Sequence, residues 1–309
     1  MGALYLIAGS VLLWFGAETF VRCSAALALR MGLTPLAVGL TVVAFGTSAP
    51  ELGVSLDSTL SGLGEVATGN VVGSNIANVA LVLGLAALVR PIEVRARLLR
   101  LDVPVVLLAS VLVAVLFRDG ELGRAGGGLL LASLVAYLTW QLRMARREAG
   151  VPGPHVGRKA ARRPLPVIAT LIVVGLGMLA LGSHAFVGGA EMLAAQLGVS
   201  PALIALTIVA VGTSLPELAT SIVAAARGEG DIAVGNVVGS NAFNLLGILG
   251  VTALVRPIAR GAVSPVDFGV MIAFALVLLP VMRTGYRISR LEGGLLLAGY
   301  VAYLGWLVR

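Results

Sequence analysis

Two glutamates inside apolar stretches carry the clearest chemical signal in the sequence. Glu51 closes the segment TVVAFGTSAPE at 41–51, and Glu217 closes TIVAVGTSLPE at 207–217. A charged side chain at the centre of a membrane helix costs about 2.5–3.5 kcal/mol on insertion scales and by default marks a functional site. No basic side chain lies deep in an apolar stretch except His184, so an internal ion pair does not account for both glutamates. The two carboxylates therefore predict a cation site.

The prolines before these glutamates add backbone oxygens to the predicted site. Pro50 and Pro216 have no N–H to offer the carbonyls of Gly46 and Gly212, and their rings clash with those groups. We expect each helix to kink there and to release carbonyl oxygens. Irregular backbone at membrane depth is tolerated only where it is buried in protein or lines a cavity. Freed carbonyls next to a carboxylate are suitable ligands for a hard cation.

A second shared segment, GNVVGSN, supplies neutral oxygens at 69–75 and 235–241. Soft metals prefer thiolate and imidazole, whereas Ca²⁺ takes 6–8 oxygen ligands. Two carboxylates can neutralise one Ca²⁺ or several monovalent cations, but not both at once, and this mutual exclusion is the thermodynamic basis of an antiporter. The polar residues of the segment follow at i, i+4 and so share one helix face, as Asn70, Ser74 and Asn78, and again as Asn236, Ser240 and Asn244.

The composition requires that these residues be held by membrane helices. Of 309 residues, 58% are hydrophobic and 12% are charged, and the mean hydropathy is +1.01. A soluble domain carries about 25% charged residues, so a water-soluble globular protein is excluded. The single Cys23 excludes a disulfide framework, and two histidines are too few for a His-rich metal site. The net charge of +7 is explained by loop arginines and needs no nucleic acid.

Hydropathy predicts an all-α polytopic membrane protein with ten transmembrane helices. About 20 apolar residues are needed for each crossing. The apolar runs are 3–21, 35–60, 66–89, 101–117, 125–142, 165–186, 200–226, 231–255, 264–282 and 291–308.

The chain contains an internal duplication. A shift of 166 residues places 35–92 on 201–258 without a gap, with 31 identities in 58 positions. Each half then holds five helices, and an odd number of crossings makes the second half enter from the opposite side. We expect a first five-helix repeat at 1–142, a basic linker at 143–164 and a second repeat at 165–309. Inverted repeats with a site at their interface are typical of transporters.

The distribution of charge predicts the orientation. The loop at 143–163 holds seven basic residues against one acid, Glu148. Placing this loop in the cytoplasm puts 17 of the 22 basic residues inside, which is a clear positive-inside signal. The prediction is a multi-pass protein of the cell (plasma or inner) membrane with both termini outside.

The segments GTSAPE and GTSLPE, each followed by GNVVGSN, resemble the paired α-repeats of the cation/Ca²⁺ exchanger superfamily, on the side of its prokaryotic Na⁺/Ca²⁺ exchangers. The resemblance covers both repeats. It implies four ion sites that share the two glutamates, and sliding of the first and sixth helices as the alternating-access motion. The ion ligands that it implies are the Ala44 carbonyl, Thr47, Ser48, Glu51, Ser74 and Asn78, and in the second half the Ala210 carbonyl, Thr213, Ser214, Glu217, Ser240 and Asn244.

The sequence also departs from parts of that superfamily. K⁺-dependent relatives and some archaeal ones have Asp where this chain has Asn244, so the site keeps two carboxylates, which argues against K⁺ co-transport. H⁺/Ca²⁺ relatives typically carry an additional acid in the GN segment, where this chain has Val72 and Val238. The long regulatory domain of animal exchangers is not expected, because the 143–163 loop is too short to hold it.

These observations favour a secondary antiporter that exchanges Na⁺ for Ca²⁺, with H⁺/Ca²⁺ or other cation/Ca²⁺ exchange as the alternative. An enzyme is not expected, since the polar residues offer no nucleophile and base. No cofactor, nucleic acid or protein partner is implied. The expected partners are the transported Ca²⁺ and Na⁺, protons as competitors for the carboxylates, and the lipid bilayer.

A few residues lie outside this constellation. Glu18 and His184 occupy the same repeat position, where packing or an interfacial role is favoured over a gate. The tyrosines and tryptophans near the ends of the fifth and tenth spans, Tyr137 among them, fit an interfacial aromatic belt.

We predict that Glu51→Gln and Glu217→Gln each abolish Ca²⁺ transport while the protein still inserts and folds. Either change leaves one carboxylate to balance two positive charges. Removing an uncompensated buried charge does not harm a fold and can stabilise the ion-free state. The measurement is ⁴⁵Ca²⁺ uptake into liposomes beside the thermal unfolding of the same preparations. Wild-type uptake in both single variants would refute the site assignment.

Overall fold

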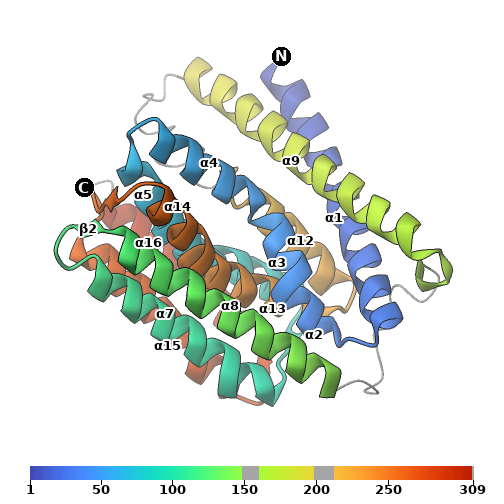
Figure 1. Cartoon of the computed structure of the whole chain (residues 1–309). Coiled ribbons are helices and arrows are strands. Elements are labelled where there is room, and N and C mark those ends of the chain that lie inside the picture. The colour runs from blue at the N-terminus through green and yellow to red at the C-terminus, as the bar shows by residue number, and fades with distance from the viewer. Residues whose placement is uncertain (148–159, 198–211, 308–309) are drawn as a thin grey trace.

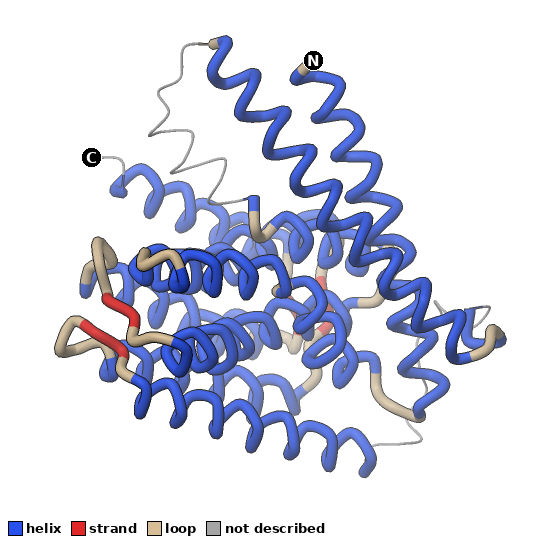
Figure 2. The backbone as a smooth tube through the Cα atoms, turned by 45° about the horizontal axis from the view of Figure 1, so that its top comes forward, coloured by secondary structure: helices blue, strands red, loops and turns tan. Residues whose placement is uncertain are grey.

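Long apolar helices build almost the whole fold (Figures 1 and 2). The structure is a computed structural model that describes residues 1–147, 160–197 and 212–307. Within these residues seven helices are long and apolar enough to cross a membrane. Four of them are single α-helices, namely α1 (Gly2–Met31), α8 (Arg124–Arg147), α9 (Leu165–Gln196) and α15 (Pro265–Arg283).

The other three spans change helix type along their length, because a π-helical turn interrupts or precedes the α-helix. They are α5 (Gly64–Ala77) continued by η2 (Asn78–Val82) and α6 (Leu83–Val89), η3 (Leu98–Asp102) continued by α7 (Val103–Leu116), and α13 (Gly230–Ala242) continued by η6 (Phe243–Ile248) and α14 (Leu249–Val255).

An eighth span is broken in its middle. Its first part runs through α2 (Pro35–Val38), η1 (Gly39–Val43) and α3 (Ala44–Thr47), and its second part is α4 (Ala49–Leu60), bent by 43° from the first. The break supports the kink that Pro50 predicts.

The remaining two of the ten predicted spans are described less completely. Of the run 200–226, residues 200–211 lie outside the described part, and α12 (Leu215–Ala226) follows. The last run forms α16 (Arg290–Leu307), which is not among the helices apolar enough to qualify. The count of ten stays a prediction. Of the predicted linker, only the end of α8 and the short 3₁₀ helix η4 (Ala160–Arg162) are regular structure among the described residues.

Two helices are longer than hydropathy predicts. The runs 3–21 and 165–186 become α1 with 30 residues and α9 with 32. Hydropathy stops at Arg22, but the helix continues through a segment in which Ser24, Ala25, Ala26 and Ala28 are buried. At 1.5 Å per residue each helix is about 45 Å long, which exceeds the roughly 30 Å of a bilayer core. Such helices must tilt or project beyond it.

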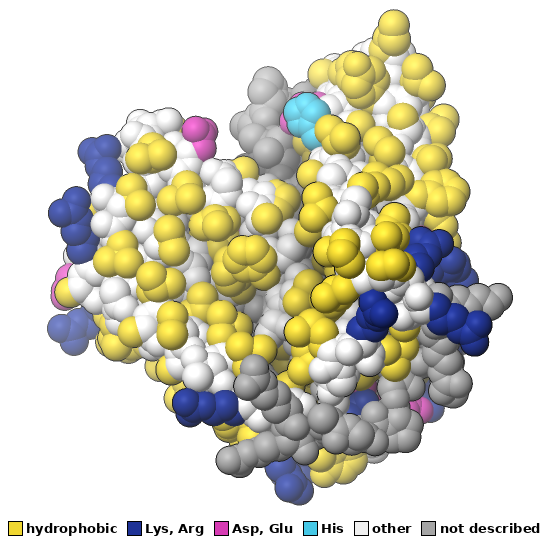
Figure 3. Space-filling view, turned by 45° about the vertical axis from the view of Figure 1, so that its right-hand side comes forward, with side chains coloured by type: hydrophobic (Ala, Val, Ile, Leu, Met, Phe, Trp, Pro, Cys, Tyr) yellow, Lys and Arg dark blue, Asp and Glu magenta, His cyan; other side chains and the backbone are white. Residues whose placement is uncertain are grey.

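The helices with the GNVVGSN segments occupy the centre. In the apolar windows of α5–α6 and α13–α14, 78% and 83% of residues are buried, against 28–39% for the other five spans. Figure 3 shows one face of the molecular surface, on which hydrophobic side chains are widespread and Lys and Arg lie toward the edges. A surface of this kind suits a lipid environment.

Glycines hold α1 and α9 against each other along their length (Figures 1 and 2). A Cβ added at Gly9 would lie 2.6 Å from the backbone nitrogen of Phe186, and one at Gly182 would lie 2.8 Å from that of Leu13. Small residues of this kind let membrane helices approach closely. The facing pairs are Gly2 with Gly189, Gly9 with Gly182, and Gly16 with Gly175.

Short strands join the predicted halves at two places. β1 (Ile92–Glu93) pairs antiparallel with β4 (Arg287–Ile288), and β2 (Glu121–Leu122) pairs with β3 (Ile258–Ala259). The 166-residue shift carries β1 onto β3 and β2 onto β4. The two strand pairs are therefore repeat equivalents, since each pairs the first strand of one half with the second strand of the other. The helices pair across the halves as well, α1 with α9, α6 with α16, α7 with α15 and α8 with α14.

The aromatic-belt interpretation is wrong for Tyr137. Its side chain is buried, and its hydroxyl donates to Asp102 Oδ1 over 3.1 Å. In the second half the Tyr303 hydroxyl donates to Asp267 Oδ1 over 2.8 Å. Each tyrosine thus fixes a carboxylate near the start of a neighbouring span. Hydropathy cannot reveal this, because the acid and the tyrosine are more than 30 residues apart.

We predict that Gly182→Ala lowers the stability of the protein by about 1–3 kcal/mol, because the new methyl group overpacks against α1. Gly188 of α9 is the matched control, since a Cβ there would meet nothing within 4 Å. Gly188→Ala should leave stability unchanged or raise it, because alanine is the better helix former. Thermal unfolding of the purified variants in detergent measures both, and equal shifts would contradict the close approach of α1 and α9.

Candidate functional site

The two glutamates lie at matching positions, just after a break in their helices. Ser48, between α3 and α4, has φ −83° and ψ 6°, and Ser214, just before α12, has φ −84° and ψ 6°. Pro50 and Pro216 stand in the first two positions of the helices that follow, where a missing N–H costs nothing. Glu51 and Glu217 therefore fall in the first turn, where the N-terminal end of the helix dipole stabilises negative charge.

Both carboxylates are fully buried, with 0% exposure. Glu217 Oε1 accepts a hydrogen bond from the Ser48 hydroxyl over 2.9 Å, while its Oε2 and both oxygens of Glu51 have no partner. Among the described residues no basic side chain forms an ion pair with either glutamate. Buried carboxylates are normally paired or bound to a metal, because an isolated one is expensive. The arrangement is a site that lacks positive charge.

The hydroxyl groups around the glutamates join the two halves of the chain. The Thr47 hydroxyl lies 3.0 Å from Asn236 Oδ1, and the Ser214 hydroxyl donates to the Ser74 hydroxyl over 3.4 Å. The Ser240 hydroxyl donates to the carbonyl of Ala44 over 3.4 Å. Each contact links residues that are at least 140 positions apart in the sequence. The predicted ligands thus meet at one interface.

The two predicted amide ligands lie on π-helical turns. Asn78 is the first residue of η2, and Asn244 lies within η6. Asn78 donates its Nδ2 to Asn241 Oδ1 over 3.1 Å, and its own Oδ1 is buried without a partner. Neither amide atom of Asn244 has a partner. π-Turns inside α-helices occur often at functional sites, but the sequence offers no signal that would have placed them here.

The released carbonyls are only partly available. The Gly212 carbonyl accepts a hydrogen bond from the Ser183 hydroxyl of α9 over 2.6 Å, and the Ala44 carbonyl accepts one from the Ser48 N–H over 3.1 Å. Ala210, the other predicted carbonyl ligand, lies outside the described residues. The Thr213 hydroxyl points to Asn70 Oδ1 at 3.5 Å. The other predicted ligands are all described, and one of them, Ser48, bonds directly to Glu217.

The donor set suits an exchangeable hard cation. Every unpartnered ligand atom among the predicted site residues is oxygen, apart from the amide nitrogen of Asn244. Within the described residues there is no group of three His, Cys, Asp or Glu side chains that could hold a metal. Charge count is one determinant of affinity for Ca²⁺. Two carboxylates among neutral oxygens therefore favour reversible binding over a closed structural metal centre.

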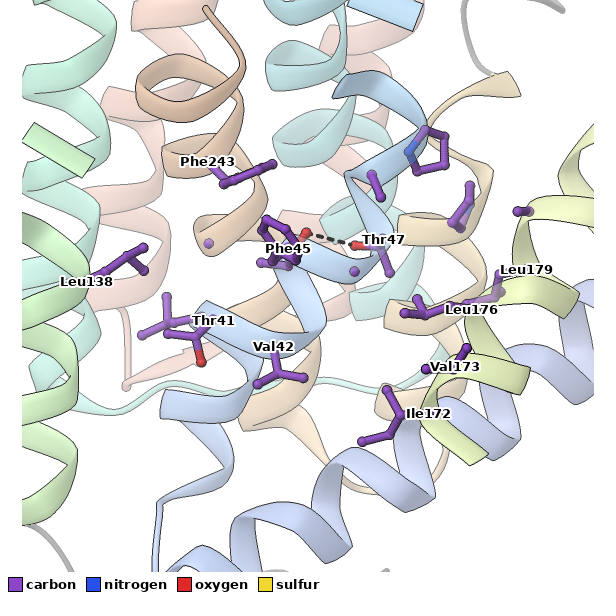
Figure 4. Close-up of a pocket in the computed structure, with 18 of the residues that line it drawn as sticks. Thr41, Val42, Phe45, Thr47, Leu138, Ile172, Val173, Leu176, Leu179 and Phe243 are labelled. Carbon is purple, nitrogen blue, oxygen red and sulfur yellow. Dashed lines mark hydrogen bonds between the residues drawn. The ribbon is translucent and has the colours of Figure 1, made fainter. Parts of the chain in front are cut away.

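An apolar cavity of about 930 Å³ lies between α9 and the broken span next to the site (Figure 4). Beside it α9 touches the broken span directly, since a Cβ at Gly46 would lie 3.0 Å from the Leu176 side chain. Ile172, Val173, Leu176 and Leu179 of α9 form one wall, and Thr41, Val42, Phe45, Thr47, Leu138 and Phe243 lie opposite.

Glu18 lies away from the glutamates and has partners of its own. Its Oε1 is 2.5 Å from Arg22 Nη2 and 2.7 Å from Arg227 Nη2. Because Arg227 directly follows α12, this ion pair ties α1 to the bundle. The sequence placed Glu18 at an interface but could not identify this partner, which lies 209 positions away.

The chain is similar to known cation exchangers and antiporters over almost its whole length. The profile of the family described as "Sodium/calcium exchanger protein" matches residues 1–143 and 167–309. The chain is 37% identical to the putative antiporter CaxA of Alkalimonas amylolytica, over 98% of this chain and 97% of that protein. It is 33% identical to the sodium/calcium exchanger MaX1 of Methanosarcina acetivorans, over 97% of both. A solved structure of the sodium-calcium exchanger NCX_Mj, soaked with zero Na⁺ and Ca²⁺, superposes with a TM-score of 0.85 at 33% identity, covering 99% of this chain and 98% of that one.

We predict that Asn244→Asp binds Ca²⁺ about tenfold more tightly at pH 8, because it adds a third carboxylate where no amide hydrogen bond is lost. Asn78→Asp is the matched control in the other half. There an aspartate would lose the donor to Asn241 and place two acceptors together, so binding should weaken. Equilibrium ⁴⁵Ca²⁺ binding to the purified variants measures both effects. Equal changes in the two variants would contradict the asymmetry described above.

Proposed function

Since the chain belongs to the sodium/calcium exchanger family, within the cation/Ca²⁺ exchanger superfamily, we propose that it is a secondary antiporter that exchanges Na⁺ for Ca²⁺ across the membrane. The observation that carries the proposal is the pair of fully buried carboxylates, Glu51 and Glu217, without counter-charges among the described residues. The cations that would neutralise them are the transported ions.

The exchange follows from competition for the same negative charge. One Ca²⁺ balances both carboxylates, and so do monovalent ions bound at neighbouring oxygens. Occupancy by one kind excludes the other, because the surplus positive charge would sit in a medium of low dielectric constant. The ligands we propose are the twelve residues predicted from the sequence. Among them Asn78 and Asn244 supply neutral amide oxygens, and the Ala210 carbonyl lies outside the described residues.

The proposed architecture is ten transmembrane helices in two inverted five-helix repeats. The first repeat is 1–142, with its duplicated region at 35–92, and the second is 165–309, with its duplicated region at 201–258. The doubled strand pairing, the matching serines at the helix breaks and the helix pairs that cross the halves support this arrangement. We place the 143–164 linker in the cytoplasm and both termini outside the cell membrane.

Alternating access is proposed to use α1 and α9 as one moving unit. Their glycine contacts hold them together, and the apolar cavity beside α9 leaves room on one side. The unit is tied to the bundle by a few specific polar contacts, among them Glu18 with Arg227 and Ser183 with the Gly212 carbonyl. Movement of the unit would break such ties and uncover the site from the other side.

The test is ⁴⁵Ca²⁺ flux into liposomes that contain the purified protein, with Na⁺, K⁺ and H⁺ gradients imposed separately. An outward Na⁺ gradient should drive Ca²⁺ uptake, and K⁺ should have no effect, because the site has two carboxylates and not three. Uptake driven by a pH gradient alone would replace Na⁺ with H⁺ as the exchanged ion. A K⁺ requirement would refute the argument from site charge, and no uptake under any gradient would refute the antiporter.

A further inference from the structure

Two asparagines outside the proposed ligand set make the same contacts twice. Asn70 of α5 donates its Nδ2 to the Glu51 carbonyl over 3.2 Å and to the Ser55 hydroxyl over 3.0 Å. Its repeat equivalent, Asn236 of α13, donates to the Glu217 carbonyl over 3.4 Å and to the Ser221 hydroxyl over 3.0 Å. Each asparagine therefore donates a hydrogen bond to the backbone carbonyl of the glutamate in its own half.

The other end of each amide reaches into the opposite half. Asn236 Oδ1 is 3.0 Å from the hydroxyl of Thr47, and Asn70 Oδ1 is 3.5 Å from the hydroxyl of Thr213. One amide thus links the glutamate of one half to the ligand threonine of the other. The linkage is crossed, because each threonine belongs to the half that its asparagine does not.

The orientation of the amide is fixed by its donors. The backbone carbonyl of the glutamate can only accept, so a flipped amide would place two acceptors together there. The NH₂ group must therefore face that carbonyl, and the oxygen faces the threonine. A threonine hydroxyl has one hydrogen and two lone pairs. The Thr47 hydroxyl lies 3.0 Å from Asn236 Oδ1 and 3.1 Å from the Val43 carbonyl, and whichever of the two accepts its hydrogen, its lone pairs are free for a cation.

We propose that Asn70 and Asn236 are positioning residues that set the affinity of the site for Ca²⁺ without touching the ion. They do so by aligning the threonine of one half with the glutamate of the other. The inference rests on the proposed function, because it takes Ca²⁺ as the ion that the glutamates bind. Asn236 is the stronger case, since it is fully buried and its contact to threonine is shorter.

The first measurement is equilibrium ⁴⁵Ca²⁺ binding to the purified protein in detergent. Asn236→Ala should weaken binding by about 10- to 100-fold, the range found for residues that orient metal ligands. Asn70→Ala should have a smaller effect in the same direction, because Asn70 is less buried and its contact to Thr213 is longer. Ser221→Ala removes only one acceptor of Asn236 and provides a milder variant if Asn236→Ala unfolds.

The decisive measurement uses the crossed pattern as its own control. Asn236→Ala should couple to Thr47→Val, so that the double variant differs from the product of the single effects by at least about threefold. With Thr213→Val it should not couple, so the affinity of the Asn236→Ala, Thr213→Val double variant should lie within about twofold of the product of those two single effects. Asn70→Ala should show the reverse, coupling to Thr213→Val and not to Thr47→Val. Loss of stability alone would not produce such a pattern.

Unchanged affinity in Asn236→Ala and Asn70→Ala, or equal coupling of each asparagine to both threonines, would overturn the inference while leaving the antiporter intact. Binding by the wild type without flux under any imposed gradient would overturn the antiporter, and the crossed coupling would still decide the inference. A wild type that binds no Ca²⁺ would overturn both.

Discussion

Two buried carboxyl groups inside a bundle of apolar helices, with no basic side chain paired to either among the described residues, are the constraint on which this structure depends. An isolated ionised carboxylate in a medium of low dielectric constant costs far more than one helix can supply in stability. The fold places Glu51 and Glu217 at helix starts, gives one of their oxygens to Ser48 and leaves the others without a partner. Pairing the two glutamates with arginine side chains would remove the cost of burying their charge, but it would leave no oxygens free to bind an ion.

Keeping oxygens available in a dry interior requires rigid surroundings. The polar residues near the glutamates satisfy one another across the halves, as Asn78 does with Asn241 and Ser214 with Ser74. A partly satisfied polar network is costly wherever a group is left without a partner. Here the groups without partners are mostly those that would face a cation, and the groups that hold them in place are bonded. The most buried helices are those that carry this network.

The sequence predicts the chemistry of this protein better than its shape. The glutamates, the prolines and the duplicated GNVVGSN segment are local signals, and residue types and spacing were sufficient to select residues that the fold brings into contact across the halves, such as Ser48 with Glu217 and Ser214 with Ser74. That these residues bind ions stays a prediction. Features that depend on distant partners were not predictable. The role of Tyr137 requires Asp102, and that of Glu18 requires Arg227. The lengths of α1 and α9 were missed for a related reason, because hydropathy measures compatibility with lipid whereas helix continuation past Arg22 depends on packing.

The pairing of helices across the halves has a consequence for how the chain is made. In each of the four pairs α1–α9, α6–α16, α7–α15 and α8–α14, the partner lies more than 100 residues later in the sequence. At a synthesis rate of roughly 5–20 residues per second, about 8–30 s separate the completion of α1 from that of α9. During that interval the glycine face of α1 meets lipid, and the first glutamate has no second one beside it. The amino-terminal helices must therefore remain in the bilayer without their packing partners until the carboxy-terminal half has been synthesised. The carboxy-terminal helices, in contrast, find their partners already in place.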